Sequence, residues 1–140
     1  MKAKQLLFFS ASALALFFSG SALAEEVQEG RYVRIAELEI DPAQLESFKS
    51  AIKEGIETAV RVEPGVLALY AVSEADNPAH IKVFEVYTNA NAYKAHLETS
   101  HFMKFRATTD QMVISKTLVD AVPIILSAKT KRERSEQMLK

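Results

Sequence analysis

The sequence predicts an α+β fold: a four-stranded antiparallel sheet with helices on one face. Strand-forming residues, mainly aliphatic and aromatic, gather in four separate runs. These runs span residues 31–40, 66–72, 81–88 and 116–126. Helical periodicity indicates one long helix between the first two runs and two short helices between the last two. The resulting order, β-α-β-β-α-(α)-β, is that of a ferredoxin-like split β-α-β unit.

The first strand runs directly into a strong helix start. Asp41 is a suitable N-cap, Pro42 fits the first helical position, and Gln44 is placed to complete a capping box. Apolar residues then recur at helical spacing while charged residues fill the opposite face, as expected of a helix lying on a sheet. Gly55 weakens this helix and marks a close approach or a bend. The Glu-Pro-Gly segment at 63–65 ends it.

The second and third strands are predicted to pair as a hairpin. Residues 66–72 are almost continuously apolar, and the segment 73–79 that follows contains Asp-Asn-Pro, which is typical of a turn. The chain then returns through 81–88 as an antiparallel partner. His80 lies in the connection and is expected to be exposed.

The fourth run and the second run are apolar at both odd and even positions. A sheet whose second face met water would alternate polar and apolar residues, so we expect another partner on that face. A second copy of the chain is the economical candidate, with Leu69 or Ile124 at the interface. The alternatives are a local accident of composition and a C-terminal tail that folds over the sheet.

The N-terminal segment resembles a secretory signal. Lys2 and Lys4 precede an apolar stretch at 6–18, and Ala-Leu-Ala at 22–24 is a cleavage signal. The rival interpretation is a membrane anchor, but the apolar run is shorter than the roughly 20 residues that span a bilayer. The sequence thus predicts a signal peptide at 1–24, a domain at 25–127, a basic tail at 128–140, and a periplasmic or secreted location.

Composition excludes several classes of function. The net charge is −1 and there is no cysteine, which argues against a nucleic-acid-binding surface and against disulfides. No glycine-rich nucleotide fingerprint or Gly-x-Ser-x-Gly motif occurs. His96 and His101 are five positions apart, which on one continuous helix would turn them to different faces. We therefore predict no metal site and no cofactor.

The segment from Phe84 to Arg106 holds the best candidates for chemistry. The third strand carries Glu85 and Tyr87 toward a helix, capped by an asparagine, on which Tyr93 and His96 share one face. A second helix, capped by a threonine or a serine, follows with Phe102, Phe105 and Arg106. This arrangement predicts one wall of a small-molecule pocket, and an ordinary α+β core is the alternative.

His96 is the candidate base, because a free imidazole titrates near neutral pH. Glu85 has apolar neighbours and could fix the tautomer of His96 or raise its pKa. Tyr93 could orient a polar substrate through its phenol. The alternatives are a core histidine bonded to Tyr87 or Glu85, a glutamate exposed at the sheet edge, and a tyrosine that only packs against Leu97.

The pattern Glu85-x-Tyr87 followed by AYKAHLETSHF at 92–102 resembles the antibiotic biosynthesis monooxygenase family. A typical family pattern is Glu-x-Trp/Tyr, then Ala-x-x-x-His-Leu-x-Thr-Pro/Ser-His. The resemblance extends from about Tyr32 to Leu126. It implies a dimer in which two sheets pack face to face as an α+β barrel.

The resemblance also implies a cofactor-independent monooxygenase that uses O₂ on a small electron-rich aromatic such as a quinol. His96 would be the base, with Glu85 or Tyr93 as its orienter. The substrate-binding positions would be Tyr87, His101, Phe102 and Arg106. Isomerisation of a small hydroxy-ketone, or small-molecule binding without catalysis, are the alternative functions.

At two places the sequence differs from related proteins, and these differences bear on the reaction that we expect. Haem-degrading relatives have an asparagine, a tryptophan and a haem-ligating histidine where this chain has Leu38, His96 and Arg106. Some quinol-oxidising members have a tryptophan where Tyr87 stands here. The chain has no tryptophan at all, and the first departure argues against haem degradation.

Overall fold

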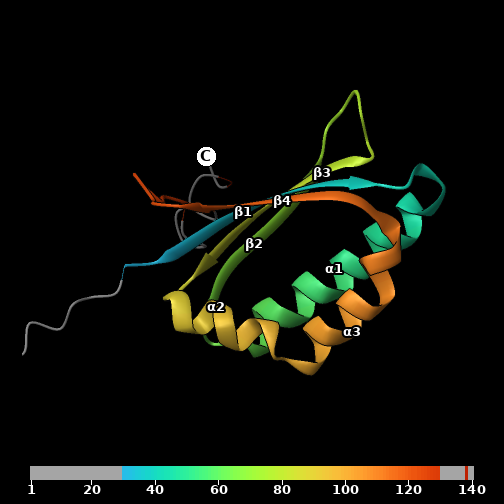
Figure 1. Ribbon diagram of the computed structural model, residues 1–140. Coiled ribbons are helices and arrows are strands. Elements are labelled where there is room, and N and C mark those ends of the chain that lie inside the picture. Colours follow the sequence, from blue (N-terminus) through green and yellow to red (C-terminus); the bar gives the residue numbers. More distant parts are fainter. Residues whose placement is uncertain (1–29, 130–137, 139–140) are drawn as a thin grey trace, which may run out of the picture.

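The computed structural model describes residues 30–129 and 138. The predicted signal segment and most of the predicted basic tail lie outside these residues. The α+β prediction is confirmed: helices form one layer and a four-stranded antiparallel sheet forms the other (Figure 1). The strand order is β2-β3-β1-β4. No helix within the described residues has the length and apolar character needed to cross a membrane.

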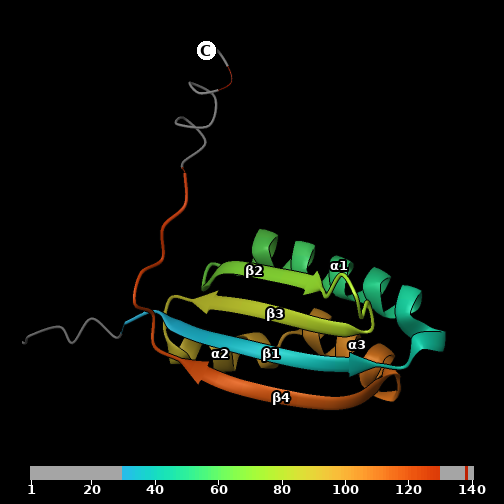
Figure 2. The same cartoon turned by 90° about the horizontal axis from the view of Figure 1, so that it is seen from above.

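The elements follow the predicted order along the chain. They are β1 (Tyr32–Ile40), α1 (Leu45–Val62), β2 (Val66–Ser73), β3 (His80–Tyr87), α2 (Ala90–Leu97), α3 (Ser100–Thr109) and β4 (Val113–Ala121), with short 3-10 turns at Pro42–Gln44 and Asp110–Met112. Figure 2 looks onto the sheet and shows β1 between β3 and β4. Side chains of β1 therefore lie beside those of β3 on one side and of β4 on the other.

The helix-facing side of the sheet carries the core. A cluster of buried side chains joins β1 and β3 to α1: Ala36, Leu38, Ile40, Phe48, Ile81 and Val83. A second cluster of Ala59, Val66 and Tyr87 lies at the other end of α1. Each fully buried valine, leucine, isoleucine or phenylalanine side chain contributes about 1.5–3 kcal/mol to folding. The two clusters fix α1 across the sheet.

Two of the three predicted helix caps are present, and the third has moved. Asp41 accepts a hydrogen bond from the Ala43 amide at 2.9 Å and so caps the 3-10 turn Pro42–Gln44, whereas α1 begins at Leu45 without a side-chain cap. The capping box is not formed: the Gln44 side chain donates to the Asp41 carboxylate, and the Asp41 amide donates to the Met112 carbonyl. Asn89 caps α2 through the Ala92 amide at 2.9 Å. Thr99, rather than the serine after it, caps α3. The caps of α2 and α3 place the start of each helix and so fix the direction in which its side chains point.

The predicted bounds of β4 were wrong: it begins three residues earlier than predicted and ends at Ala121 instead of 126. A register shift between Glu39 and Ile40 allows pairing to begin at Val113. Ala121 pairs with Val33, near the beginning of β1, so little partner strand remains beyond it. Pro123, which has no amide hydrogen, disfavours continuation. The following residues leave the sheet (Figure 2).

The far face of the sheet is apolar in part: the paired Val33 and Val86 are buried there, whereas the outer strands β2 and β4 are exposed. The register places Tyr70, Val72 and Val119 on this face, and all three are exposed. The two expected interface residues do not lie there: Leu69 faces the helices, and Ile124 is exposed beyond β4. Leu69 faces the helices because it pairs with the helix-facing Glu85, and β4 ends before Ile124.

Candidate functional site

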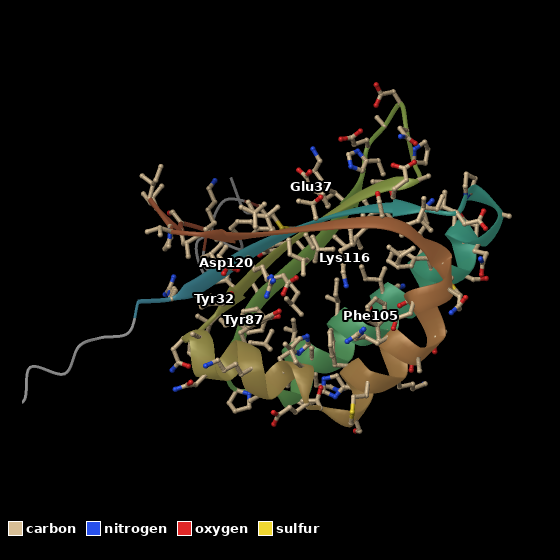
Figure 3. All side chains as sticks on the ribbon, viewed as in Figure 1. Tyr32, Glu37, Tyr87, Phe105, Lys116 and Asp120 are labelled. Atoms are coloured by element: carbon tan, nitrogen blue, oxygen red, sulfur yellow. The ribbon has the colours of Figure 1, made fainter. Side chains whose placement is uncertain are left out.

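A cavity of about 290 Å³ lies between the sheet and the helices. Its apolar part is formed by side chains such as Leu38, Phe48, Ile52, Phe105 and Leu118. Its polar lining includes Arg34, Glu85, Tyr93, His96 and His101, and also Arg106, Thr109, Asp110 and Lys116. Figure 3 shows Phe105 rising from α3 and Lys116 descending from β4 into the space between the layers. The cavity thus suits a small molecule with an apolar body and a polar end.

Glu63 joins two histidines at the polar end. Its oxygen Oε1 lies 2.8 Å from His96 Nδ1 and 2.5 Å from His101 Nε2. Glu63 is the C-cap residue of α1, His96 is in the last turn of α2, and His101 is in the first turn of α3. Three helix ends therefore converge on one carboxylate, whose side chain is only 11% exposed.

The hydrogen bonds around Thr99 indicate which histidine nitrogens carry protons. The Thr99 hydroxyl donates its single proton to the His96 carbonyl at 2.7 Å, so at 3.2 Å it accepts from His101 Nε2. His101 Nε2 is therefore protonated and also donates to Glu63. An ionised carboxylate only accepts, so His96 Nδ1 donates to Glu63 as well. In the neutral ring this leaves His96 Nε2 as the nitrogen that can take a proton.

Glu85 has a different partner from the one expected. The Tyr87 hydroxyl donates to Glu85 at 2.6 Å, whereas His96 bonds to neither residue and only has its ring 5.6 Å from that of Tyr87. Burial raises the pKa of Glu85, opposed by the Tyr87 hydrogen bond and the nearby charges of His96 and Arg34. Burial and the Glu85 charge raise the pKa of Tyr87. Glu85 is thus neither the hydrogen-bond partner of His96 nor an exposed edge residue, although its charge interacts with that of His96.

Tyr93 forms an aromatic wall beside Arg34. Its ring stacks on Tyr32 with centroids 5.1 Å apart and meets Tyr87 edge-on at 5.3 Å. The guanidinium carbon of Arg34 lies 4.6 Å from the centre of the Tyr93 ring. Burial raises the pKa of the Tyr93 phenol, while Arg34 lowers it. Tyr93 therefore lies at the cavity as predicted, but not beside His96 as its orienter.

The remaining predicted residues lie around this site. The Phe102 ring packs against His96 with centroids 4.7 Å apart, and both line the cavity. Arg106 also lines the cavity and forms an ion pair with Asp110 at 3.3 Å. His80, expected to be exposed, is the first residue of β3 and pairs with a glutamate across the hairpin.

Glu63 lies outside the sequence motif, and the Glu-Pro-Gly segment that contains it indicates only the end of a helix. The different faces expected on one continuous helix do not apply to His96 and His101, since α2 ends at Leu97 and the predicted second helix begins at Ser100. An acidic residue at the end of an amphipathic helix, before a tight turn, was the available signal. The turn brings this side chain back toward α2.

Glu63, His96 and His101 are also a set that could hold a metal ion. One ligand atom from each lies within 4.8 Å of the others. Two imidazoles and a carboxylate are ligands that Zn²⁺ and Fe²⁺ accept. Binding would require His101 Nε2 to lose the proton that it shares with Glu63 and Thr99. Hydrogen bonds already join the three side chains without a metal.

The sequence profile of a family described as "Antibiotic biosynthesis monooxygenase" matches residues 31–108. A crystal structure of a "Putative antibiotic biosynthesis monooxygenase" from Bacteroides thetaiotaomicron is 43% identical, with a TM-score of 0.70; the match covers 74% of this chain and 99% of that chain. A protein of the same description from Nitrosomonas europaea is 26% identical, with a TM-score of 0.64, over 67% of this chain and 99% of that chain.

A monooxygenase-type structure from Lactobacillus acidophilus is 32% identical, with a TM-score of 0.66. The match covers 68% of this chain but only 45% of that one. No curated protein matches the chain significantly. These similarities support a monooxygenase-type function and do not favour the hydroxy-ketone isomerase alternative. The profile match covers more than half of the chain, and the chain therefore belongs to the antibiotic biosynthesis monooxygenase family.

Proposed function

We propose that this protein is a cofactor-independent monooxygenase that acts on a small electron-rich aromatic such as a quinol. The observation that carries the proposal is the hydrogen bond between Glu63 and His96 Nδ1 at 2.8 Å. It orients a buried imidazole at the cavity with its second nitrogen available as a base. A carboxylate that orients a catalytic histidine in this way also stabilises the imidazolium formed on proton transfer.

His96 takes the role of base in this proposal, and Glu63 replaces Glu85 and Tyr93 as the orienting group. His96 Nε2 accepts the proton of a substrate hydroxyl, and the resulting positive charge lies beside the Glu63 carboxylate. General-base catalysis of this kind contributes about 10²–10⁴-fold to a rate. His101 donates to the same carboxylate and so holds it in place.

The deprotonated quinol is electron-rich and transfers electrons to O₂ directly. In the balanced reaction a quinol and O₂ give a hydroxyquinone and water. One oxygen atom enters the ring, and the other leaves as water with the two hydrogens that the quinol loses. The apolar walls, including Phe102 and Phe105, keep bulk water from the anion.

The other cavity residues bind and position the ring. Tyr93 and Phe102 offer aromatic faces against which a planar substrate can pack, a contact worth about 0.5–1.5 kcal/mol beyond its buried area. The Tyr87 hydroxyl donates a hydrogen bond to Glu85 and so holds this carboxyl group of the cavity wall in place. Arg106, held by Asp110, lies on the α3 side of the cavity.

We also propose that two copies of the chain pair through the far face of the sheet. Tyr70, Val72 and Val119 supply exposed apolar surface there. Such a surface, facing away from the helices, is suited to another sheet packed about 10 Å away. Export to the periplasm or the outside remains a prediction from the N-terminal segment.

The test is oxygen consumption by metal-free protein with hydroquinone and naphthalene-1,4-diol, with oxygen-18 used to follow the product. The unmutated protein should incorporate one labelled atom per hydroxyquinone. We expect His96→Gln to lower turnover about 10²–10⁴-fold. Glu63→Gln should lower it by a smaller factor, because the imidazole remains but its orientation and charge stabilisation are lost.

His80→Gln is the matched control, because His80 also pairs with a glutamate, at 3.0 Å, but does not line the cavity. It should leave turnover unchanged. Circular dichroism would establish that each variant is folded. A folded His96→Gln protein with full turnover contradicts the role of base, and hydrogen peroxide as the product in place of labelled hydroxyquinone contradicts monooxygenation.

A further inference from the structure

Arg34 is a cation in the cavity wall for which the structure provides an incomplete set of partners. Its side chain is 16% exposed and projects from β1, on the helix-facing side of the sheet. The nitrogen Nε is buried and has no hydrogen-bond partner within the described residues. A buried donor without an acceptor costs about 1–3 kcal/mol. Such a group calls for an explanation in a folded protein.

The neighbouring carboxylates do not satisfy it. Asp120, opposite Arg34 in the register, has its Oδ1 3.8 Å from Nε, beyond hydrogen-bond distance. That oxygen already accepts the Tyr32 hydroxyl at 2.7 Å. Glu85, opposite on the other side, accepts the Tyr87 hydroxyl, and its burial favours the neutral form by raising its pKa.

The guanidinium is nevertheless held in place. It lies over the Tyr93 ring at 4.6 Å, a contact that stabilises a cation and restricts the guanidinium plane. The Tyr93 ring is itself stacked on Tyr32. A guanidinium fixed in this way is preorganised to bind two oxygens of a planar anion. The rest of the cavity is largely apolar and aromatic.

We propose that Arg34 recognises an anionic oxygen, a carboxylate or a phenolate, on the aromatic ligand of this cavity. The inference rests on the proposed function only in taking this cavity as the place where the substrate binds. The ligand's apolar ring would occupy the part lined by Phe102 and Phe105. Its anionic oxygen would pair with the guanidinium charge from the cavity side.

The first arm of the test compares gentisate with its methyl ester by titration calorimetry. The two share a dihydroxylated ring and differ in the carboxylate. We expect the unmutated protein to bind the acid at least about tenfold more tightly, as a hydrogen-bonded charge pair allows. Arg34→Gln should abolish this preference, and Arg34→Lys, which keeps charge without the planar fork, should keep part of it.

The second arm tests a phenolate with 4-nitrophenol, whose ionised form absorbs visible light. Binding beside Arg34 should favour the phenolate and lower the apparent pKa of the bound probe. The absorbance change should disappear in Arg34→Gln. A preference in one arm alone identifies which anionic oxygen the cavity takes.

Lys116→Gln is the matched control, because Lys116 also lines the cavity and carries the same charge. It should keep both preferences, whereas an equal loss in the two variants would mean a general charge effect and would overturn the proposal. Equal binding of acid and ester, with no response of 4-nitrophenol, would overturn it too. His96→Gln should retain the preference, so failure of catalysis is distinguishable from failure of this inference.

Discussion

Glu85 is a carboxyl group whose surroundings make its ionisation unfavourable. It lies on β3 at the cavity and accepts the hydroxyl of the fully buried Tyr87. Because burial raises its pKa above the ordinary value of 4.5, the folded state binds a proton at this site more readily than the unfolded state. The stability from this proton is fully present below the ordinary value and is lost as pH rises through the raised pKa.

Glu85→Gln should therefore gain stability relative to the unmutated protein as pH rises. Glutamine keeps a carbonyl oxygen for Tyr87 and carries no charge to be buried. Urea unfolding between pH 4 and 8 would measure the free-energy difference. Glu54→Gln is the control of opposite sign, since the hydrogen bond from Lys104 lowers the pKa of Glu54. A difference for Glu85→Gln that is constant with pH would contradict the burial argument.

At the scale of single residues, the motif predicted which side chains gather but not how they bond. Helical spacing predicts Tyr93 and His96 on one face of the same helix, and Phe102 follows in the next helix; all three line the cavity. The partner of His96 could not be obtained in this way, since Glu63 is 33 residues away and reaches it only through the tertiary fold. The place of Arg34 in the cavity wall could not be predicted either, because it also depends on the tertiary fold.

At the scale of elements, two glycines have opposite roles. Gly55 is inside α1, and a Cβ added there would lie 3.6 Å from the Phe105 ring, an ordinary contact distance. Gly65 lies in the turn between α1 and β2, and an added Cβ would approach the Ala92 Cβ to 2.5 Å, which is too close. The expected close approach thus belongs to Gly65 instead of Gly55.

Gly55→Ala should stabilise the protein by about 1 kcal/mol, because alanine favours the helix and the space accepts its methyl group. Gly65→Ala should destabilise it, because α2 or the turn must shift. Thermal unfolding of the two variants would measure both effects. A loss of stability in Gly55→Ala similar to that in Gly65→Ala would contradict the assignment of the close contact to Gly65.

Element order was predictable because each element carries its own signal, such as the Asn89 cap of α2. The ends of β4 were not, since they depend on its partner. Pairing begins at the register shift after Glu39 and ends near the start of β1. The apolar run that continues past Ala121 has no strand to pair with in the described part of the chain.

At the scale of the whole molecule, the proposed pairing of two copies makes a quantitative prediction. Val119 lies on the far face of the sheet and is 45% exposed, so Val119→Asp should place an unpaired charge in the interface. The cost of several kcal/mol should convert the dimer to a monomer. Light scattering at micromolar concentration would measure the mass.

Val60→Asp is the matched control, because Val60 lies on α1 in the other layer and is 48% exposed. The same substitution at nearly the same exposure should leave the mass of the dimer unchanged. An unmutated protein that is a monomer at this concentration would contradict the proposed pairing.

Because three helix ends meet at Glu63, the hydrogen bonds of His96 and His101 exist only while these helix ends are folded. If the last turn of α1 opens, Glu63 leaves both histidines, and the imidazoles lose the acceptor that sets their protons. A substitution that loosens the end of α1 would therefore act on proton transfer even though it touches no substrate. His96 is thus an active base only in the fraction of molecules in which the ends of α1, α2 and α3 are folded together around Glu63.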